Sequence, residues 1–184
     1  MIRRPPRSTL SSSSAASDVY KRQVSDLDGD LEAITTNYNN GYSVLIVHAH
    51  GDNIRQIEIL AELLTHERIV GTTQVKGTTK VLNLGGFTDG DRAAYIAANM
   101  QARQVILLAF DFGEKIGSYS KPEQKLPHQP MTERKRIKLA IAKQLLSLLP
   151  TRFPKTAFYN CTPAGEAIPN IQTISFKELK KRLH

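Results

Sequence analysis

Residues 42–53 read YSVLIVHAHGDN, and this stretch decides the fold class. Its first eight residues form a continuous apolar run of strand length, which is typical of a strand that is buried on both faces of a parallel sheet. Polar residues follow at once, and Asn53 then precedes IRQIEILAELLTHE, whose apolar residues recur at helical spacing. The stretch therefore predicts a buried strand, a polar turn and a helix that Asn53 caps.

The same alternation continues on both sides of this stretch. Further strands are expected at residues 68–73, 80–84, 104–110 and 156–160. Helices are expected at 31–39 between the caps Asp30 and Gly41, at 90–101 opened by Asp89, at 132–149 and at 175–183. Residues 114–131, with three prolines, are expected to form a long loop. Strands that alternate with helices predict an α/β fold, with a mostly parallel sheet and helices on both faces.

The first 23 residues have a different composition from the rest of the chain. They read MIRRPPRSTLSSSSAASDVYKRQ, which is rich in Arg, Pro and Ser and predicts disorder. An Arg- and Ser-rich N-terminus also fits an organelle transit peptide, but this segment most closely resembles translated adapter sequence. We therefore expect residues 1–23 to be an artefactual tail, and residues 24–184 to form a single catalytic domain that lacks its N-terminal part.

Composition narrows the class of protein. Hydrophobic residues make up 40% of the 184 residues and charged residues 23%, as in an ordinary globular chain. No apolar run approaches the ~20 residues that span a bilayer, so no membrane partner is expected. The single cysteine, Cys161, fits a reducing cytosol, and a cytoplasmic location is predicted.

The net charge of +8 raises the alternative of a basic nucleic-acid-binding module. Such a module would use Lys135, Lys138, Lys180, Lys181 and Arg182. Helix 132–149 carries a predicted apolar stripe, which consists of Ile137, Leu139, Ile141, Leu145 and Leu148. This stripe places the lysines on a solvated face, so no nucleic-acid partner is expected.

Polar and acidic residues follow five consecutive strands, the first of which would end just before Asp26. They are Asp26, Asp28 and Asp30; His48, His50, Asp52 and Asn53; Thr72, Thr73 and Gln74; Asn83, Gly85, Gly86, Thr88, Asp89, Asp91 and Arg92; and Asp111, Phe112 and Gly113. In doubly wound sheets ligands bind at the carboxyl ends of the strands. Capping explains single residues of this kind, but five such ends predict an active site at one edge of the sheet.

The residue types at this edge suit metal-assisted phosphoryl transfer. Crowded carboxylates repel one another unless a cation neutralises them, and Mg²⁺ is held by one or two carboxylates together with substrate phosphates. Glycines allow close approach of backbone N–H groups to phosphate, and Arg92 adds a fork-shaped donor. The sequence contains neither GxxxxGK[ST] nor GxGxxG. A transition metal held by His48, His50 and Asp52 is a less favoured alternative.

The blocks SDLDGD, VHAHGDN, GTTQ, NLGGFTDGDRA and FDFGEKIGSYSKP, in this order, resemble the archaeal 6-hydroxymethyl-7,8-dihydropterin diphosphokinase family. That family is similar to thiamine pyrophosphokinases in its catalytic fold. The resemblance covers residues 24 to about 169. It implies Mg²⁺-dependent transfer of diphosphate from ATP to the reduced pterin with release of AMP, in the biosynthesis of tetrahydromethanopterin or folate-type cofactors.

The resemblance also implies roles for individual residues. Asp26, Asp28 and Asp89 would hold the metal, and Asp28, Asp52, Asp89 and Arg92 would be catalytic. Substrate and nucleotide would contact His48, His50, Asn53, Thr72, Thr73, Gln74, Asn83, Gly85, Gly86, Thr88, Asp91, Asp111, Phe112 and Lys121. The general base is unassigned, and the oligomeric state is open, a homo-oligomer included.

Family members carry an apolar strand before the residue that matches Asp26, whereas this chain has DVYKRQVS there. We therefore expect the chain to bind ATP poorly and to be less stable than a complete protein. Two other activities remain open. One is diphosphate transfer to another alcohol such as thiamine. The other is a haloacid-dehalogenase-like phosphatase with Asp26 as the nucleophile.

Overall fold

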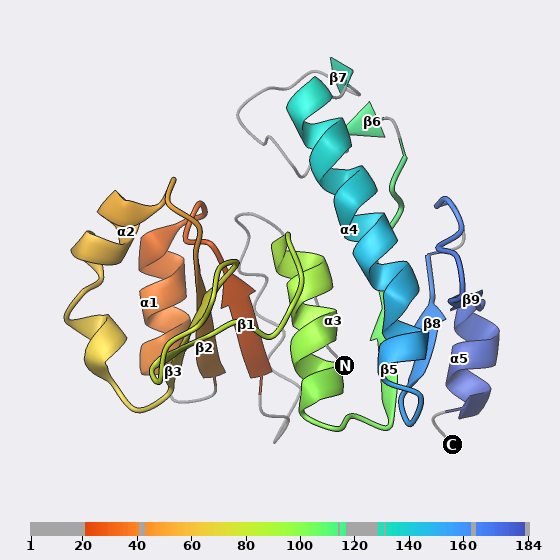
Figure 1. Cartoon of the computed structure of the whole chain (residues 1–184), viewed down its shortest axis with the longest axis horizontal. Coiled ribbons are helices and arrows are strands. Elements are labelled where there is room, and N and C mark those ends of the chain that lie inside the picture. Colours follow the sequence, from red (N-terminus) through yellow and green to blue (C-terminus); the bar gives the residue numbers. More distant parts are fainter. Residues whose placement is uncertain are drawn as a thin grey trace. The chain divides into compact units, whose positions relative to one another are not determined.

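The computed structural model describes residues 21–40, 43–113, 115–116, 129–130, 132–162 and 165–182. These residues divide into two compact units, one that ends at Asn83 and one that begins at Leu84 (Figure 1). We call them the first unit and the second unit and describe each by itself. The sequence predicted one domain, and whether the two units act as one catalytic domain stays a prediction.

The first unit is a parallel sheet with helices. Its strands are β1 (Lys21–Ser25), β2 (Ser43–Ala49), β3 (Ile69–Thr73) and β4 (Val81–Leu82), in the order β1-β2-β3-β4. Its helices are α1 (Leu31–Asn39), α2 (Ile54–Ile59) and the 3-10 turn η1 (Leu63–Thr65). Every strand pair is parallel, so the four carboxyl ends lie at the same edge of the sheet.

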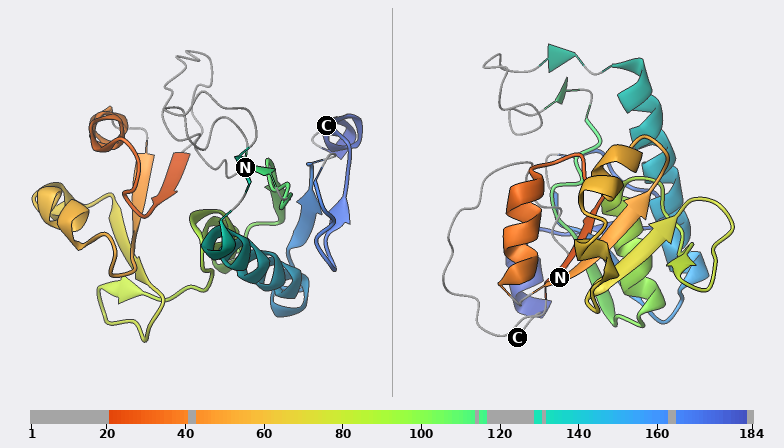
Figure 2. Two further views of the ribbon diagram at one scale, coloured as in Figure 1. Left: turned by 90° about the horizontal axis from the view of Figure 1, so that it is seen from above. Right: turned by 90° about the vertical axis from the view of Figure 1, so that its left-hand side faces the viewer.

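The core of the first unit lies on one face of its sheet. Leu45 and Val47 alternate along β2 and pack against Ile34 and Tyr38 of α1. Leu60, the C-cap residue that follows α2, belongs to the same cluster. The helices α1 and α2 therefore cover the same face, as Figure 2 shows from above.

The second unit contains a second parallel sheet. It consists of β5 (Gln104–Leu107), β8 (Ala157–Asn160) and β9 (Gln172–Thr173), in the order β5-β8-β9. The helices are α3 (Asp89–Asn99), α4 (Glu133–Arg152) and α5 (Phe176–Arg182). Two short strands, β6 (Lys115–Ile116) and β7 (Gln129–Pro130), pair in the antiparallel sense.

Helices cover both faces of this second sheet. On one face Leu107 packs in a cluster with Ala94 of α3 and Leu146 of α4. On the other face Ile106 packs with Leu179 of α5. The predicted fold class, an α/β arrangement of parallel strands with helices on both faces, is thus confirmed. In the described part of the chain, no helix is long and apolar enough to cross a bilayer.

The predicted strands and most helix starts are confirmed. Asp30 caps α1 with its carboxylate, which accepts from the backbone N–H groups of Glu32 and Ala33. Thr132 caps α4 by accepting from the N–H of Lys135. Gly41, the predicted C-cap glycine, lies outside the described residues. The predicted loop at 114–131 contains the short pair β6 and β7.

The predicted boundary of the N-terminal tail is wrong for its last three residues. Lys21–Gln23 belong to β1, which pairs with β2 from Lys21↔Ser43 to Ser25↔Val47. The sequence hid this strand because its side chains are polar. A strand at the edge of a sheet needs only backbone pairing on one side, and the side chain of Arg22 is exposed.

Two helix predictions are also corrected. The helix predicted over residues 54–67 is shorter, because α2 ends at Ile59 and the chain turns before η1. In α4 the buried residues are Ala142, Leu146 and Leu149, whereas Ile137 and Leu148 of the predicted stripe are each 51% exposed. The two stripes lie on adjacent sides of one helix, and apolar spacing alone does not distinguish them.

Candidate active site

The candidate residues are divided between the two units. Residues up to Asn83 lie in the first unit, and those from Gly85 onward lie in the second. Lys121 lies outside the described residues. We therefore describe the two groups of residues in turn.

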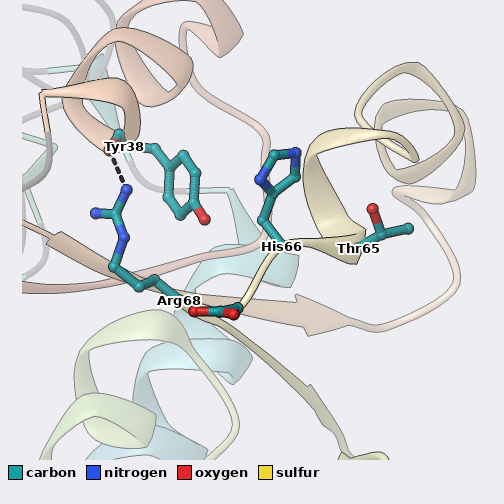
Figure 3. A pocket seen from close by; sticks show the side chains of 5 residues that line it. Tyr38, Thr65, His66 and Arg68 are labelled. Atoms are coloured by element: carbon teal, nitrogen blue, oxygen red, sulfur yellow. Dashed lines mark hydrogen bonds between the residues drawn. The ribbon is translucent and has the colours of Figure 1, made fainter.

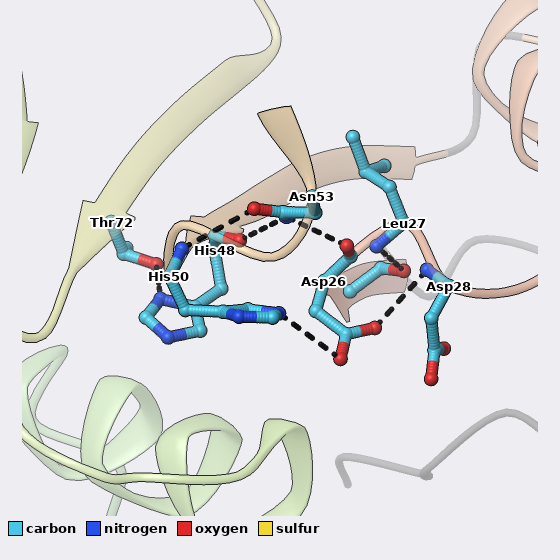
Figure 4. A network of polar contacts seen from close by, with 8 residues as sticks. Asp26, Leu27, Asp28, His48, His50, Asn53 and Thr72 are labelled. Atoms are coloured by element: carbon cyan, nitrogen blue, oxygen red, sulfur yellow. Dashed lines mark hydrogen bonds and ion pairs between the residues drawn. The ribbon is translucent and has the colours of Figure 1, made fainter. Parts of the chain in front are cut away.

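The loop after β1 presents two carboxylates on the same side. Asp26 and Asp28 flank Leu27, whose backbone adopts a left-handed conformation with φ of 64°. The side chain of Leu27 is buried in the core, and this anchors a conformation that a bulky residue rarely adopts. The N–H of Leu27 donates to Oγ of Ser25 at 3.0 Å, and the N–H of Asp28 donates to Oδ1 of Asp26 at 3.2 Å. Figure 4 shows both carboxylates directed to the same side of the loop.

The turn after β2 lies against this loop. Nε2 of His50 lies 3.5 Å from Oδ2 of Asp26. The ring of His50 is tilted by 35° against that of His48, with 5.5 Å between the ring centroids. Asp52, in the same turn, is exposed. The structure thus brings two predicted site residues from separate strands, Asp26 and His50, into contact.

His48 is buried and contacts Thr72 of β3, its partner in the sheet register. The Thr72 hydroxyl donates to the backbone oxygen of Val47 at 3.1 Å and lies 3.5 Å from Nδ1 of His48. A hydroxyl has one proton, so Thr72 is left to accept from an N–H at Nδ1. This contact favours the tautomer in which Nε2 of the neutral ring carries no proton.

The prediction that the Asn53 side chain caps a helix is wrong. Asn53 precedes α2, but its side chain makes no hydrogen bond to the helix. Instead, Nδ2 donates to the backbone oxygens of Asp26 and His48, each at 2.7 Å, and Oδ1 accepts from the N–H of His50 at 3.3 Å (Figure 4). The side-chain amide of Asn53 therefore hydrogen-bonds to the two loops and does not cap α2.

Asn83 closes the loop between β3 and β4. Its Nδ2 donates to the backbone oxygens of Gln74 and Val75, at 3.1 and 3.0 Å. Thr73 accepts from the N–H of Val75 in the same loop, at 3.4 Å. These contacts shape the loop after β3, and contact with a nucleotide stays a prediction for all three predicted residues.

In the second unit, Asp91 organises the start of α3. Its carboxylate accepts from the N–H of Phe87 at 2.6 Å, from the N–H of Thr88 at 2.7 Å and from the Thr88 hydroxyl. Thr88 is the N-cap residue and forms a capping box with Asp91, one position before the predicted helix start at Asp89. The Asp91 carboxylate therefore accepts hydrogen bonds from the two residues that precede α3.

Arg92 is also buried, and its Nη2 donates to the backbone oxygen of Gly86 at 2.8 Å. Burial lowers the pKa of Arg92, and the nearby charges of Asp91 and Asp89 oppose this effect. Burial raises the pKa of Asp91, against the hydrogen bonds from Thr88 and Phe87. These two residues hold the loop before α3, a role that the sequence did not predict.

The glycines of this loop have a structural explanation. Gly85 and Gly86 have φ of +92° and +87°. A Cβ on Gly85 would lie 2.5 Å from the ring of Tyr95, and one on Gly86 would overlap the backbone of Arg92. The loop therefore needs glycine for its packing against α3, whether or not phosphate binds there.

The segment after β5 carries the remaining predicted residues. Asp111 is exposed, and its backbone oxygen accepts from the N–H of Glu166 at 2.8 Å. Phe112 has a left-handed backbone with φ of 50°, and its ring centroid lies 6.0 Å from that of Phe110. Such a ring pair offers a flat apolar surface, and its contact with a heterocycle stays a prediction.

Asn160 is a residue that sequence reasoning missed. It ends β8, is 1% exposed, and neither its Oδ1 nor its Nδ2 has a hydrogen-bond partner within the described structure. Buried amides are normally hydrogen-bonded, so an unsatisfied one at the carboxyl end of a parallel strand marks a candidate functional residue. Its signal in the sequence was an Asn at the end of the apolar run TAFYN.

Replacement of Asn160 with leucine is expected to stabilise the protein. The change Asn160→Leu keeps the branched shape and removes two unsatisfied polar atoms, and we expect a gain of about 1–2 kcal/mol in the free energy of unfolding. Urea denaturation monitored by circular dichroism measures it, and Thr156→Val is the matched control because Thr156 donates to the backbone oxygen of Ala102 at 2.8 Å. A loss of stability in Asn160→Leu as large as in the control would contradict the expectation.

The residues after β1 fit a divalent cation of the magnesium type. Two neighbouring carboxylates and water satisfy a hard cation that needs few protein ligands. Across the described ranges, no group of three or more His, Cys, Asp or Glu side chains is arranged to hold a metal ion. The pair Asp26 and Asp28 therefore suits Mg²⁺ better than a metal that needs a cage of three or four protein ligands.

A pocket in the first unit lies away from these residues. It is lined by Tyr38, Thr65, His66, Glu67 and Arg68 (Figure 3). Tyr38 is near the end of α1, and residues 65–68 lead into β3, so the pocket lies at the amino-terminal edge of the sheet. Arg68 donates to the backbone oxygen of Tyr38 at 3.1 Å, and its Cζ lies 4.3 Å from the ring centroid. These contacts join the end of α1 to the residue before β3, at the sheet edge opposite the candidate site.

Comparison with known proteins confirms the resemblance that the sequence blocks indicated. Three curated archaeal proteins named 6-hydroxymethyl-7,8-dihydropterin pyrophosphokinase are similar to this chain. The Pyrococcus furiosus protein is 40% identical over 126 residues, which are 68% of this chain and 52% of the relative. The Methanothermobacter thermautotrophicus protein is 40% identical over 126 residues (68% and 53%), and the Methanocaldococcus jannaschii protein 42% over 131 residues (68% and 53%).

The chain spans about half the length of the curated relatives it matches. No family model matches the chain, and no solved structure matches it.

Proposed function

We propose that this chain belongs to the archaeal 6-hydroxymethyl-7,8-dihydropterin diphosphokinases and takes part in diphosphate transfer from ATP to the reduced pterin. The observation that carries the proposal is the identity of 40–42% with three archaeal proteins of that name. In the proposed reaction the hydroxymethyl oxygen forms a bond to the β-phosphorus, the bond between that phosphorus and the α–β bridging oxygen breaks, AMP leaves, and the hydroxyl proton is released. The product would serve the synthesis of tetrahydromethanopterin or a folate-type cofactor, and the substrates suggest a cytoplasmic reaction.

The loop after β1 supports a magnesium-dependent reaction. Asp26 and Asp28 would hold the cation. Asp89 lies in the second unit, and its part in the cation site stays a prediction. When bound, Mg²⁺ neutralises phosphate charge and orients the transferred group. His50 lies beside Asp26 and is proposed to contact the nucleotide. Asp52 is exposed in the same turn and is proposed to contact the nucleotide.

The remaining residues divide into loop-holding and ligand-contacting groups. Asn83, Asp91, Arg92, Gly85 and Gly86 have contacts or packing that explain them within their own loops. We therefore propose that these five act by shaping the site. For the pterin we propose Asp111 and the ring of Phe112, because a flat heterocycle stacks on an aromatic face.

The direct test is AMP formation from ATP, Mg²⁺ and 6-hydroxymethyl-7,8-dihydropterin. Because the relatives are about twice as long as the matched part, the assay uses two proteins: the 184-residue chain, and the Pyrococcus furiosus relative with its aligned segment replaced by the matching residues of this chain. We expect pterin-dependent AMP formation by the hybrid and its loss in the hybrid with Asp28→Asn. A folded hybrid that forms no AMP would contradict the proposal.

The same assay separates the alternatives. AMP formation with thiamine but not with the pterin would indicate a related diphosphokinase. Release of phosphate from phosphate esters, with a phosphorylated Asp26, would indicate a haloacid-dehalogenase-like phosphatase.

A further inference from the structure

Asn53 lies where the strands β1 and β2 separate. The two strands pair as far as Ser25↔Val47, and the next residues along each strand are Asp26 and His48. Nδ2 of Asn53 donates to the backbone oxygens of both residues, each at 2.7 Å. A side-chain amide thus joins the two strands at the first position beyond their backbone ladder.

The Asn53 amide holds the backbone at the start of the two loops that follow β1 and β2. The carboxylate of Asp26 accepts from the N–H of Asp28 and lies 3.5 Å from Nε2 of His50. The backbones of both Asp26 and His50 are tied to the Asn53 amide, the first through its carbonyl and the second through its N–H. The relative position of the carboxylate and the imidazole therefore depends on this one side chain, which is 3% exposed.

The three backbone groups that Asn53 contacts are the oxygens of Asp26 and His48 and the N–H of His50. The bridge needs a nitrogen with two N–H groups and a separate acceptor oxygen, on a side chain with a single methylene. Only asparagine has this arrangement. Aspartate would place a carboxylate oxygen against two carbonyl oxygens. Leucine has the shape but no donor, and alanine leaves both carbonyl groups unsatisfied in a buried position.

We propose that Asn53 is a positioning residue for the divalent cation, which it serves by holding the Asp26 loop against the His50 turn. The proposal rests on the proposed function, because it assumes that Asp26 and Asp28 bind that cation. Asn53 makes no contact with the cation itself. Hydrogen-bond partners that orient metal-binding carboxylates commonly raise metal affinity by about 10- to 100-fold.

The test measures Mn²⁺ affinity of the complete 184-residue chain by calorimetric titration, with Mn²⁺ as the probe for Mg²⁺. The variants are Asn53→Ala and Asn53→Leu, and Asp26→Asn identifies the site. Ile34→Val is the matched control, because it weakens the core of the same unit, to which Leu27 also belongs, but leaves the hydrogen bonds of Asn53 intact. Urea denaturation establishes that each variant is folded at the temperature of the titration.

We expect both Asn53 variants to bind Mn²⁺ about 10- to 100-fold more weakly than the unaltered chain, with Ile34→Val unchanged. If the Asn53 variants bind Mn²⁺ as tightly as the unaltered chain, while Asp26→Asn binds it more weakly, the role of Asn53 is overturned and the proposed metal site is not. A loss in Ile34→Val as large as in Asn53→Ala would also overturn it, because the effect would then follow stability. If the unaltered chain binds no Mn²⁺, or Asp26→Asn binds it equally well, the metal site of the proposed function fails, and the Asn53 proposal fails with it.

Discussion

The change Gly86→Ala is expected to destabilise the second unit by about 3–5 kcal/mol. Two effects add. Alanine is disfavoured at φ of +87°, and its Cβ would overlap the backbone of Arg92, which lies in α3 and cannot move as a flexible side chain does. A loss of this size is a large part of the 5–15 kcal/mol that is typical of a domain.

The chain offers a specific readout for this variant. Cys161 is its single thiol, lies in the second unit and is 2% exposed, and burial raises the pKa of the thiol. Reaction with a thiol reagent in increasing urea therefore reports opening of the second unit. Gly113→Ala is the matched control, because a Cβ at Gly113 would meet nothing within 4 Å. Equal urea midpoints for the two variants would show that the loop tolerates a side chain and that our account of Gly86 is wrong.

The change Asp91→Ala is expected to cost about 3–5 kcal/mol, the usual loss when one partner of a buried charged network is removed. Three donors from Phe87 and Thr88 would lose their acceptor, and Arg92 would lose a neighbouring negative charge. Asp91→Asn should fall between the wild type and Asp91→Ala, because a carboxamide keeps one oxygen but turns an NH₂ group toward a donor.

Thiol reaction of Cys161 in urea also measures the Asp91 variants. The control is Thr132→Ala, which removes an exposed cap from α4 in the same unit and should cost about 0.5–2 kcal/mol. If Asp91→Ala loses no more stability than Thr132→Ala, the carboxylate does not hold the loop, and its predicted contact with the nucleotide becomes the better explanation.

The fold was predictable where the signals are local. Apolar runs located β2, β5 and β8, and Asp30 marked the start of α1, because a strand covered on both faces and a helix cap each depend on a few neighbouring residues. β1 was missed over Lys21–Gln23, because an edge strand is held by backbone pairing that leaves no apolar pattern.

The sequence indicates which residues follow the strands of the first unit, but not what their side chains contact. The carboxyl ends of β1, β2 and β3 meet at one edge because parallel pairing requires it. The sequence predicts that Asn53 caps a helix, whereas its side chain joins Asp26 and His48, which the pairing of β1 and β2 brings together. The sequence favours Arg92 as a phosphate donor, and no sequence pattern reveals that this arginine is buried and donates to its own loop.

The proposed function depends on the binding of one divalent cation by Asp26 and Asp28. Paramagnetic broadening by Mn²⁺ tests this binding. A substoichiometric amount of Mn²⁺ is added to the isotopically labelled chain, and the backbone amide signals are recorded by NMR. We expect the signals of Asp26 and Asp28 to lose intensity first and to recover together when Mg²⁺ is added in excess. Unchanged signals of Asp26 and Asp28, or equal broadening throughout the chain, would contradict this expectation.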